Sequence, residues 1–421
     1  MNKLIASVGA IALGTSVIQA VETGALNAQQ TKKAWSVSAS LRGFYDDNFN
    51  SQPSATKESS TGAEIGAGVD YGVAGDMTSV NFGYDFNARY YEKALNAAND
   101  RSDFTHNLNA TLTHAASERL RFTANEQFVV GQEPEFLAQG STISNPQRVS
   151  GDNYRNSASV GANFQATSRL GLGVNYNNSI TDYEDEGDDS SSSRLDRMEH
   201  TVAFQPSWVL TQQTVAIGRI QYSRSDFARE DELLQTGFTS TGKSRDSRSL
   251  VISGGLQHEF NNNLSGSFEI GGQRVEFPNN PATKETWTPW AEASVDYQLQ
   301  SQTSIRAGVS YRRSPSDLVA SVSNSDFVTD AKAASIYAEL SHQLSQRFEI
   351  GASARYQSLE FNGGIFDGRK DNFLLLGLNA AYQINPNLEA NAGYNFDDLS
   401  SDAPGRTYER NKVYLGLTAR Y

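Results

Sequence analysis

The stretch Phe104–His114, FTHNLNATLTH, decides the fold because its side chains alternate between two chemical characters. Phe104, Leu108, Ala110 and Leu112 fall on one parity, whereas every position of the other parity is threonine or asparagine. Successive side chains of a β-strand point to opposite faces. The segment therefore predicts a strand with one apolar and one polar face.

The same period of two continues on both sides of this stretch, from Trp35 to Tyr421. It is clearest over residues 63–71, 80–90 and 412–421, and single runs are about 10–15 residues long. Strands of soluble domains average about 5–6 residues, whereas a tilted membrane strand needs about 9–11 residues to cross the hydrocarbon. The run length therefore favours strands that cross a membrane.

Connectors of two kinds alternate between the runs. Short ones, such as 116–118 and 385–387, carry turn residues, and they are spaced by longer polar ones, such as 47–61 and 225–246. Short turns at one rim and longer loops at the other are typical of outer-membrane barrels, whose strand number is even. The sequence thus predicts an all-β fold, a transmembrane antiparallel up-and-down β-barrel of about eighteen strands. About sixteen strands are the alternative if one run has been divided wrongly.

Two places do not fit the pattern cleanly. In 214–224 the apolar parity is undecided between that of Val215 and that of Ile220, and a β-bulge there would switch the face. Glu126 falls on the apolar parity near the middle of its strand. An acidic side chain that faces lipid at this depth costs about 2 kcal/mol or less. We therefore expect a local bulge or a shifted register, either of which would turn Glu126 away from lipid and remove this cost.

The N-terminus has the features of an export signal. Lys3 supplies a positive charge, 4–17 are mostly apolar, and the pattern of small residues ends in a cleavage motif at Ala20. We expect three segments: a signal peptide at 1–20, a short N-terminal tail at 21–34 and the outer-membrane β-barrel at 35–421. No other run approaches the roughly 18 apolar residues that a spanning helix needs.

The composition excludes several classes of function. The 421 residues include no cysteine, which excludes a disulfide scaffold, a thiolate metal site and a cysteine nucleophile. The 48 acidic residues exceed the 35 basic ones, and the formal net charge of −13 argues against broad nucleic-acid binding. A mean hydropathy of −0.51 argues against a bundle of spanning helices but is compatible with a barrel, whose strands are only half apolar.

We expect no catalytic, cofactor or metal site, and no enzymatic activity. The chain has no G-x-S-x-G motif, and its G-x-G steps at 66–68 and 171–173 lie inside predicted strands. All five histidines fall on the apolar parity near strand ends, which favours a girdle at the membrane interface over a metal or catalytic cluster. They are His106, His114, His200, His258 and His342.

Barrels of about 16–18 strands hold an aqueous channel, so the polar parity should face water inside and the apolar parity lipid outside. The inward parity carries charges of both signs. We expect the following residues to line the lumen: Arg42, Glu64, Asp70, Asp85, Arg89, Arg121, Arg155, Glu292, Asp296, Arg306, Arg312, Glu339, Arg355 and Arg420. Asp296 and Arg306 should lie opposite each other across the turn at 300–302. These residues form either a merely solvated wall or a pore surface with weak charge preference.

Residues 412–421, KVYLGLTARY, resemble the assembly signal of Gram-negative outer-membrane β-barrels, which is a terminal aromatic preceded by alternating apolar residues. The positions that carry this resemblance are Val413, Leu415, Leu417, Ala419 and Tyr421. Tyr421 stands where phenylalanine is commoner. Together with the signal peptide and the hairpin pattern, this end makes the chain most similar to the putative β-barrel porin 2 family.

The resemblance implies an outer-membrane location, no cofactor, and three partners: outer-membrane lipid, lipopolysaccharide and the barrel-assembly machinery. Some members of the family are associated with exopolysaccharide secretion. For this chain that implies a pore that serves as the outer-membrane exit for a polysaccharide, beside a periplasmic polysaccharide-export protein. Two other roles stay open: a general diffusion porin for small hydrophilic solutes, and a plugged surface or adhesive barrel.

Two further observations bear on the cargo. No predicted loop much exceeds about 20 residues, so we expect a wide, little obstructed lumen, which mildly favours a polymer exit. Inward aromatic residues are few, so no continuous stacking track for sugars is expected. They are Phe44, Trp290, Tyr337 and Tyr414.

The assignment of the two faces can be tested at two adjacent residues. Because the chain has no cysteine, Asn109→Cys and Leu108→Cys each introduce a single thiol. In vesicles, a water-borne thiol reagent should label Asn109→Cys and leave Leu108→Cys unlabelled, because only position 109 faces water. The mass increase of the protein measures the labelling. The reverse pattern would overturn the assigned faces.

Overall fold

The computed structural model describes residues 34–95, 100–131, 152–184, 195–227, 242–280, 285–299, 302–316, 318, 321–323 and 326–421. The predicted signal peptide, and the predicted tail apart from Ala34, lie outside these residues. Strands make up most of the described chain. None of the helices within it is long and apolar enough to cross a membrane.

Eighteen strands of 12–16 residues build one sheet. They are β1 (Trp35–Asp46), β2 (Ser60–Ala74), β3 (Thr78–Tyr91), β4 (Ser102–Ser117), β5 (Leu120–Gly131), β6 (Asn153–Gln165), β7 (Leu170–Tyr183), β8 (Arg197–Val209), β9 (Thr214–Phe227), β10 (Ser247–Asn261), β11 (Leu264–Glu276), β12 (Thr286–Leu299), β13 (Thr303–Pro315), β16 (Asp330–Ser345), β17 (Phe348–Asn362), β18 (Lys370–Asn385), β19 (Leu388–Ser401) and β20 (Tyr408–Arg420). The short pair β14 (Ser321–Ser323) and β15 (Asp326–Phe327), with the 3₁₀ helices η3 (Gly242–Arg245) and η4 (Gly364–Phe366), lies between these strands.

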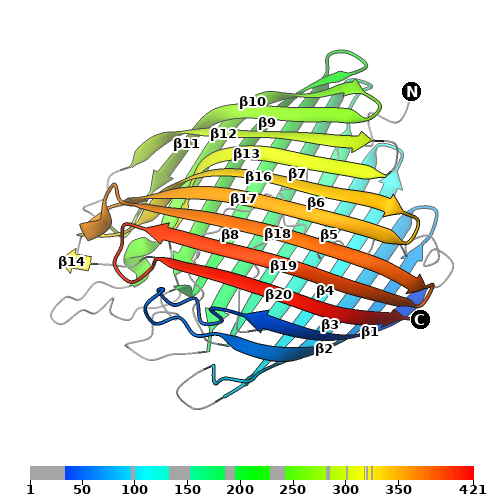
Figure 1. Cartoon of the computed structure of the whole chain (residues 1–421). Coiled ribbons are helices and arrows are strands. Elements are labelled where there is room, and N and C mark those ends of the chain that lie inside the picture. The colour runs from blue at the N-terminus through cyan, green and yellow to red at the C-terminus, as the bar shows by residue number, and fades with distance from the viewer. Residues whose placement is uncertain are drawn as a thin grey trace.

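The sheet closes on itself. Consecutive strands pair antiparallel, β13 pairs with β16, and β1 pairs with both β2 and β20. Figure 1 shows the first strand lying beside the last in the wall of the barrel. This closure confirms the predicted antiparallel up-and-down barrel with eighteen strands.

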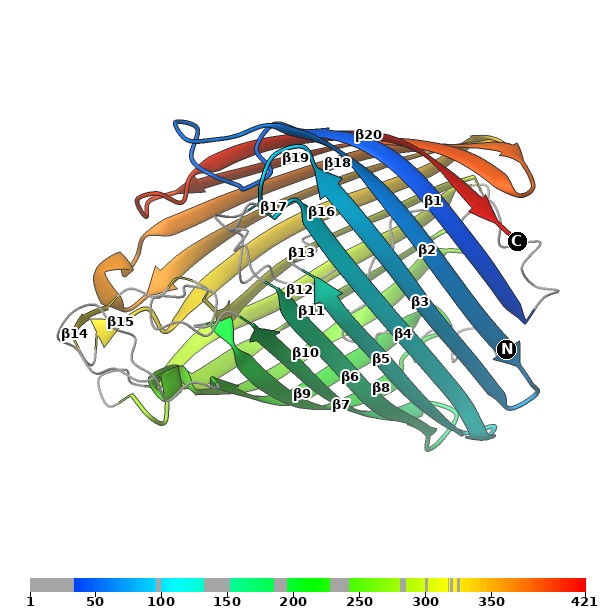
Figure 2. The same ribbon diagram turned by 90° about the horizontal axis from the view of Figure 1, so that it is seen from below.

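The two rims of the barrel differ, as the alternating connectors predict. Short turns, such as 75–77 and 386–387, join strands at one rim, where β1 begins and β20 ends (Figures 1 and 2). Longer connectors, such as 47–59 and 402–407, lie at the opposite rim. We call these the turn rim and the loop rim.

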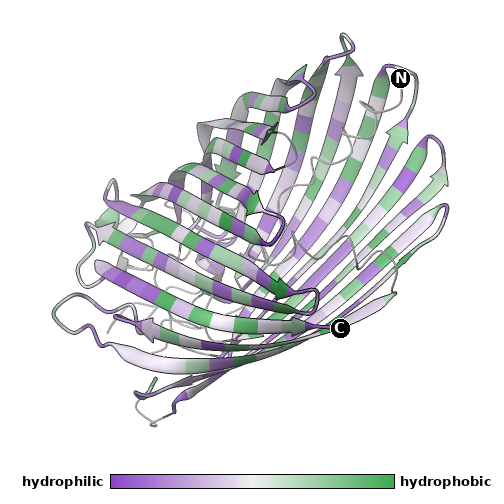
Figure 3. Cartoon of the chain, turned by 45° about the vertical axis from the view of Figure 1, so that its right-hand side comes forward, coloured by the Kyte–Doolittle hydropathy of each residue, from purple (hydrophilic) through white to green (hydrophobic). Residues whose placement is uncertain are grey.

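Side-chain exposure alternates along the strands. In β1 the outward Val37, Leu41 and Tyr45 are exposed, whereas Arg42 is half-buried and Phe44 is buried on the inner side. Figure 3 shows the matching alternation of hydropathy along the wall. The apolar parity therefore faces outward and the polar parity faces the interior, as predicted.

β9 resolves the undecided parity over 214–224, and it contains no bulge. Val215, only 1% exposed, has the inward parity, whereas Ile220 and Tyr222 are exposed on the outer face. The pairing of β9 with β8 and β10 continues without a register shift, so the bulge that the sequence suggested is absent. An apolar inward residue is tolerated here because Val215 is shielded from water.

Glu126 keeps the outward position that its parity gives it. It lies opposite Ala110 of β4 and Ala158 of β6, and the β4–β5 register shifts only at the turn, between Ala115 and Ser117. The expected bulge or register shift is therefore wrong. Within the described ranges Glu126 has no hydrogen-bond or ion-pair partner, and its two lateral neighbours are small alanines.

Closure of the barrel can be tested by a cross-link between β1 and β20. Ser40 and Thr418 face each other directly in this ladder, and opposed residues in such a pair lie within the Cα separation of about 4.4–6.8 Å that a disulfide needs. The variant Ser40→Cys/Thr418→Cys should cross-link on mild oxidation, seen as a faster band of the denatured, unreduced protein. Ser40→Cys/Leu417→Cys is the matched control, because these side chains face opposite sides. Equal behaviour of the two variants would contradict the closed seam.

Candidate functional site: the inner wall

The charged residues that we expected in the lumen all have the inward parity in the structure. Arg121 and Arg155 lie at opposite ends of the wall, near the turn rim in β5 and near the loop rim in β6. Arg420 is the last residue of β20 at the turn rim. The other eleven belong to two groups, one on β1–β3 and one on β12, β13, β16 and β17.

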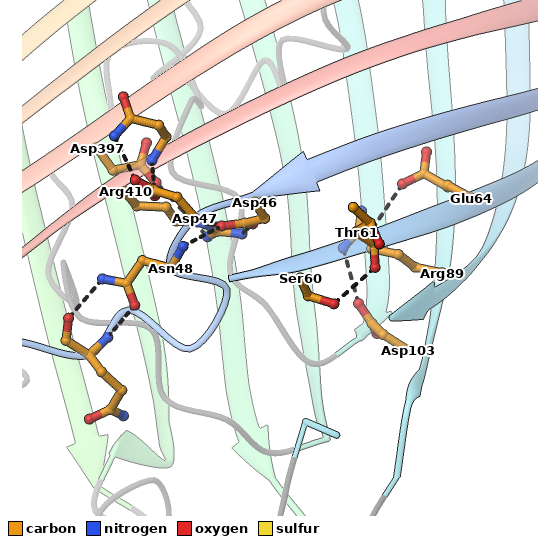
Figure 4. Close-up of polar contacts among 12 residues, drawn as sticks. Asp46, Asp47, Asn48, Ser60, Thr61, Glu64, Arg89, Asp103, Asp397 and Arg410 are labelled. Atoms are coloured by element: carbon orange, nitrogen blue, oxygen red, sulfur yellow. Dashed lines mark hydrogen bonds and ion pairs between the residues drawn. The ribbon is translucent and has the colours of Figure 1, made fainter. Parts of the chain in front are cut away.

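The first group forms a chain of ion pairs across four neighbouring strands. Arg42 Nη1 lies 3.3 Å from Glu64 Oε1, and Glu64 Oε2 accepts a hydrogen bond of 2.9 Å from Arg89 Nε. Arg89 Nη1 reaches the buried Asp103 of β4 at 3.1 Å. Figure 4 shows Arg89 between the two carboxylates. Alternating charge lets each group satisfy the next.

A second set of ion pairs, which we did not predict from the sequence, lies nearer the loop rim. Arg410 of β20, 1% exposed, donates to both carboxylate oxygens of Asp46 of β1, with Nε at 3.0 and 2.9 Å (Figure 4). Asp397 of β19 lies 4.0 Å from Arg410 Nη1. In the adjoining loop Arg406 binds the buried Asp371 at 3.0 Å. These pairs join the first strand to the last three.

The opposite wall carries a bidentate pair. Arg219 of β9 donates to Glu269 of β11 at 3.1 and 2.7 Å across β10, and Ser253 of β10 donates to the same carboxylate at 2.9 Å. The undecided parity of 214–224 hid Arg219 from sequence reasoning. The predicted Asp296–Arg306 pair is confirmed, with Arg306 Nε 2.5 Å from Asp296 Oδ1.

Each of the four inward aromatic rings that we expected from the sequence lies near a cation. The pairs and their distances to the ring centroid are Arg42 over Tyr414 at 5.3 Å, Lys412 over Phe44 at 4.9 Å, Arg219 over Trp290 at 5.3 Å and Arg355 over Tyr337 at 6.0 Å. Tyr337 also lies against Gly308 of the next strand, where a Cβ atom would come within 2.7 Å of the ring. Each of these rings therefore has a positive charge beside it on the inner wall.

Apolar side chains also face inward near the loop rim, and loop residues cover them. Leu359 and Phe361 of β17 pack with Ala331 and Ala333 of β16 beneath Val328, and all are at most 2% exposed. A second inward cluster joins β18, β19 and β20 through Phe373, Leu375, Leu399 and Tyr408. Loop residues therefore cover part of the inner wall at this mouth, and the expectation of a little obstructed lumen stays a prediction. Loops of modest length suffice, because they pack on the wall beside them.

The loops also bind one another. Arg245 of η3 is 1% exposed, donates to the Ser316 carbonyl oxygen after β13, and lies 4.2 Å over the ring of Phe227. Asn279, after β11, donates to Asp246 at 2.8 Å. Burial raises the pKa of the Asp246 carboxyl, which also accepts a hydrogen bond from the Phe227 backbone. The described parts of the loops after β9, β11 and β13 are therefore joined to one another by side-chain contacts at the loop rim.

The histidines lie on the outer face in two repeating arrangements. At the turn rim His114, His258 and His342 each bind the threonine that begins the adjacent strand, with O–N distances of 2.8, 2.9 and 2.8 Å. Nearer the loop rim His106 and His200 bind Tyr84 and Tyr176, each at 2.8 Å. Such pairs suit two interfacial girdles. In the described part of the chain, no three His, Asp or Glu residues are arranged to hold a metal ion.

The terminal strand presents its apolar residues outward. Leu415 and Tyr421 are 68% and 66% exposed, and Val413 and Leu417 are also exposed on the same face, which Ala419 shares. The residues of the predicted assembly signal thus form one continuous outer stripe.

The family model described as putative beta-barrel porin 2 matches residues 35–421. No curated protein matches the chain in sequence. The solved siderophore receptor PiuA from Acinetobacter baumannii is similar with a TM-score of 0.48 and 10% identity, covering 92% of this chain and 82% of that one. The outer membrane protein opdK from Pseudomonas aeruginosa is similar with a TM-score of 0.45 and 10% identity, covering 92% and 98%.

The buried ion pair at the seam should contribute to stability, and an exposed pair should not. Asp46→Ala leaves the guanidinium of Arg410 buried without its bidentate partner, which should lower the free energy of unfolding by about 3–5 kcal/mol. Asp296→Ala is the matched control, because that pair is 48% exposed on both sides and should cost at most about 1 kcal/mol. Urea titration in vesicles, followed by the gel shift of the folded barrel, measures both. Equal losses would contradict a stabilising role for the Asp46–Arg410 pair.

Proposed function

Because the chain belongs to the putative β-barrel porin 2 family and is an outer-membrane β-barrel, we propose that it forms a water-filled pore for polar cargo. The observation that carries this proposal is the closed sheet of eighteen strands with a polar inner wall. A barrel of this size is too wide for its own side chains to fill. Its charges of both signs suit a passage with weak charge preference.

The cargo that we favour is a secreted polysaccharide, for which the barrel would be the outer-membrane exit. The family resemblance supports this role, and so do the polar side chains that line the inner wall of β4–β8 between the rims. A second candidate is passive diffusion of small hydrophilic solutes. The loops packed on the inner wall around Val328 and Phe361 favour it, because they narrow the mouth on that side.

The proposal includes the following partners and no enzymatic activity. Residues 1–20 would direct the chain to export, and the barrel-assembly machinery would recognise the outer stripe that ends at Tyr421. Lipid and lipopolysaccharide would contact the apolar outer face and its girdles. A periplasmic polysaccharide-export protein would meet the turn rim if the cargo is a polymer. Nucleic acid, cofactors and metals have no part in it.

Single-channel recording tests the pore. The protein in a planar bilayer should give stepwise KCl currents, and a bulky water-borne thiol reagent should reduce them in Asn109→Cys. Leu108→Cys is the control and should be unaffected, because its side chain has the outward parity. Polymers of graded size, added to the bath, should enter the pore up to a larger cut-off for a polymer exit than for a small-solute porin. A folded, inserted barrel without current would contradict the pore and support a plugged barrel.

A further inference from the structure

The inner wall is chemically uneven around the barrel. On the five consecutive strands β4–β8 the inward residues from Thr105 to Ser207 carry charge only near the rims, at Arg121, Arg155 and the ion-paired Arg197 and Glu199. Between these ends the inward positions are asparagine, glutamine, serine, threonine and small residues. We call this region the neutral wall.

The rest of the wall contrasts with it. On β11–β13, β16, β17 and β1–β3 the inward parity carries carboxylates or guanidiniums along the strands and not only at the rims, among them Glu292, Arg312, Glu339 and Arg355, whereas on β18–β20 the inward charges lie toward the strand ends. Arg312 lies within electrostatic reach of both Glu292 and Arg219. The neutral wall is therefore a continuous sector of the barrel and not a gap between scattered charges.

Six inward asparagines dominate the neutral wall: Asn107, Asn109, Asn125, Asn163, Asn175 and Asn177. Two of them form long hydrogen bonds to serines of β6. Asn125 donates to Ser159 at 3.2 Å, and Asn177 donates to Ser157 at 3.3 Å. Each of these amides uses one donor in that bond and retains a second N–H and a carbonyl oxygen. Asn125 is exposed, and Asn109 and Asn177 are half-buried, so cargo in the lumen can reach them.

Amide and hydroxyl groups suit one class of cargo. A sugar hydroxyl both donates and accepts hydrogen bonds. It can therefore exchange its hydrogen bonds to water for hydrogen bonds to side-chain amides, with a small net gain in binding free energy at each site. Many weak sites in sequence let a chain enter and also leave, which passage requires. Stacking is not the alternative here, because the four inward aromatics that the sequence suggested already lie near cations.

We infer that the neutral wall is the track for an uncharged carbohydrate chain. The inference rests on the proposed pore and specifies the cargo class: a polysaccharide without regular carboxylate, sulfate or phosphate groups. Between the rims of β4–β8 an anionic polymer would lose its hydration without gaining a cation, and it would meet the carboxylates of the opposite side. The strands of 12–16 residues make the track continuous between the rims.

Current block tests the inference with defined oligosaccharides. Maltohexaose, which is neutral, should interrupt the KCl current of the wild-type protein at a lower concentration than a galacturonate oligomer of equal length. The triple variant Asn109→Ala/Asn125→Ala/Asn177→Ala should raise the half-blocking concentration of maltohexaose about tenfold, since each lost hydrogen bond weakens binding by a few-fold. Its KCl conductance should stay close to that of the wild type, because no charge changes.

The matched control makes the same change outside the neutral wall, in Asn87→Ala/Asn379→Ala/Asn395→Ala, on inward positions of β3, β18 and β19. This variant should change the half-blocking concentration less than twofold. Equal effects in both variants, or preferred block by the galacturonate oligomer, would overturn the inference and leave the pore intact. Absence of KCl current in the wild type would overturn the pore itself, and the track with it.

Discussion

The whole structure depends on the requirement that each backbone N–H and C=O finds a partner inside the protein, because hydrocarbon offers none. The pairing of backbone groups becomes complete around the barrel only where β1 binds β20, at the seam between the first and the last strand. There Val37 N donates to the carbonyl oxygen of Tyr421 at 3.1 Å, and Tyr421 N donates back to Val37 at 2.9 Å. The rings of Trp35 and Tyr421 lie 6.0 Å apart at the same point. A seam left open would expose two strand edges to lipid.

Closure also fixes the two environments of the side chains. Once every strand has two neighbours, the side chains of one parity face lipid and those of the other parity face the interior. The outer parity then accepts apolar residues and interfacial pairs such as His114 with Thr78. The inner parity accepts charge, but at the crowded loop rim a charge such as Arg410 is almost fully buried and requires Asp46 beside it.

The sequence predicts the features that depend on period two, and less of those that depend on distant contacts. Strand number, rims and facing follow from alternation, because lipid tolerates few exceptions on the outer face. The interior is less restrictive, so Val215 could face inward and leave the parity of 214–224 undecided. Glu126 shows that the outer rule has exceptions as well. Arg410 binds Asp46, which lies 364 residues away in the sequence, and no local pattern predicts this contact.

The loop cover was unpredictable for the same reason. Loop length does not indicate that Val328 packs on Phe361, which it does because inward apolar residues near the rim need shielding from water. The periodic pattern does contain a signal for this: Leu359 and Phe361 have the inward parity, where polar residues are expected. Inward apolar pairs at the loop end of a strand are therefore a better guide to loop packing than loop length.

The division of the inner wall follows from how its charges are satisfied. On β1–β3 and β9–β20 many carboxylates and guanidiniums bind one another, and the rings of Phe44, Trp290, Tyr337 and Tyr414 lie near arginine or lysine. Those charged groups already bind one another, so a passing solute must replace a partner in an ion pair to bind them. On β4–β8 a passing solute competes mainly with water for the side-chain amides and hydroxyl groups. Weak, exchangeable contacts are therefore concentrated on the sector that has the fewest charges, and cargo selection should depend on hydroxyl groups more than on net charge.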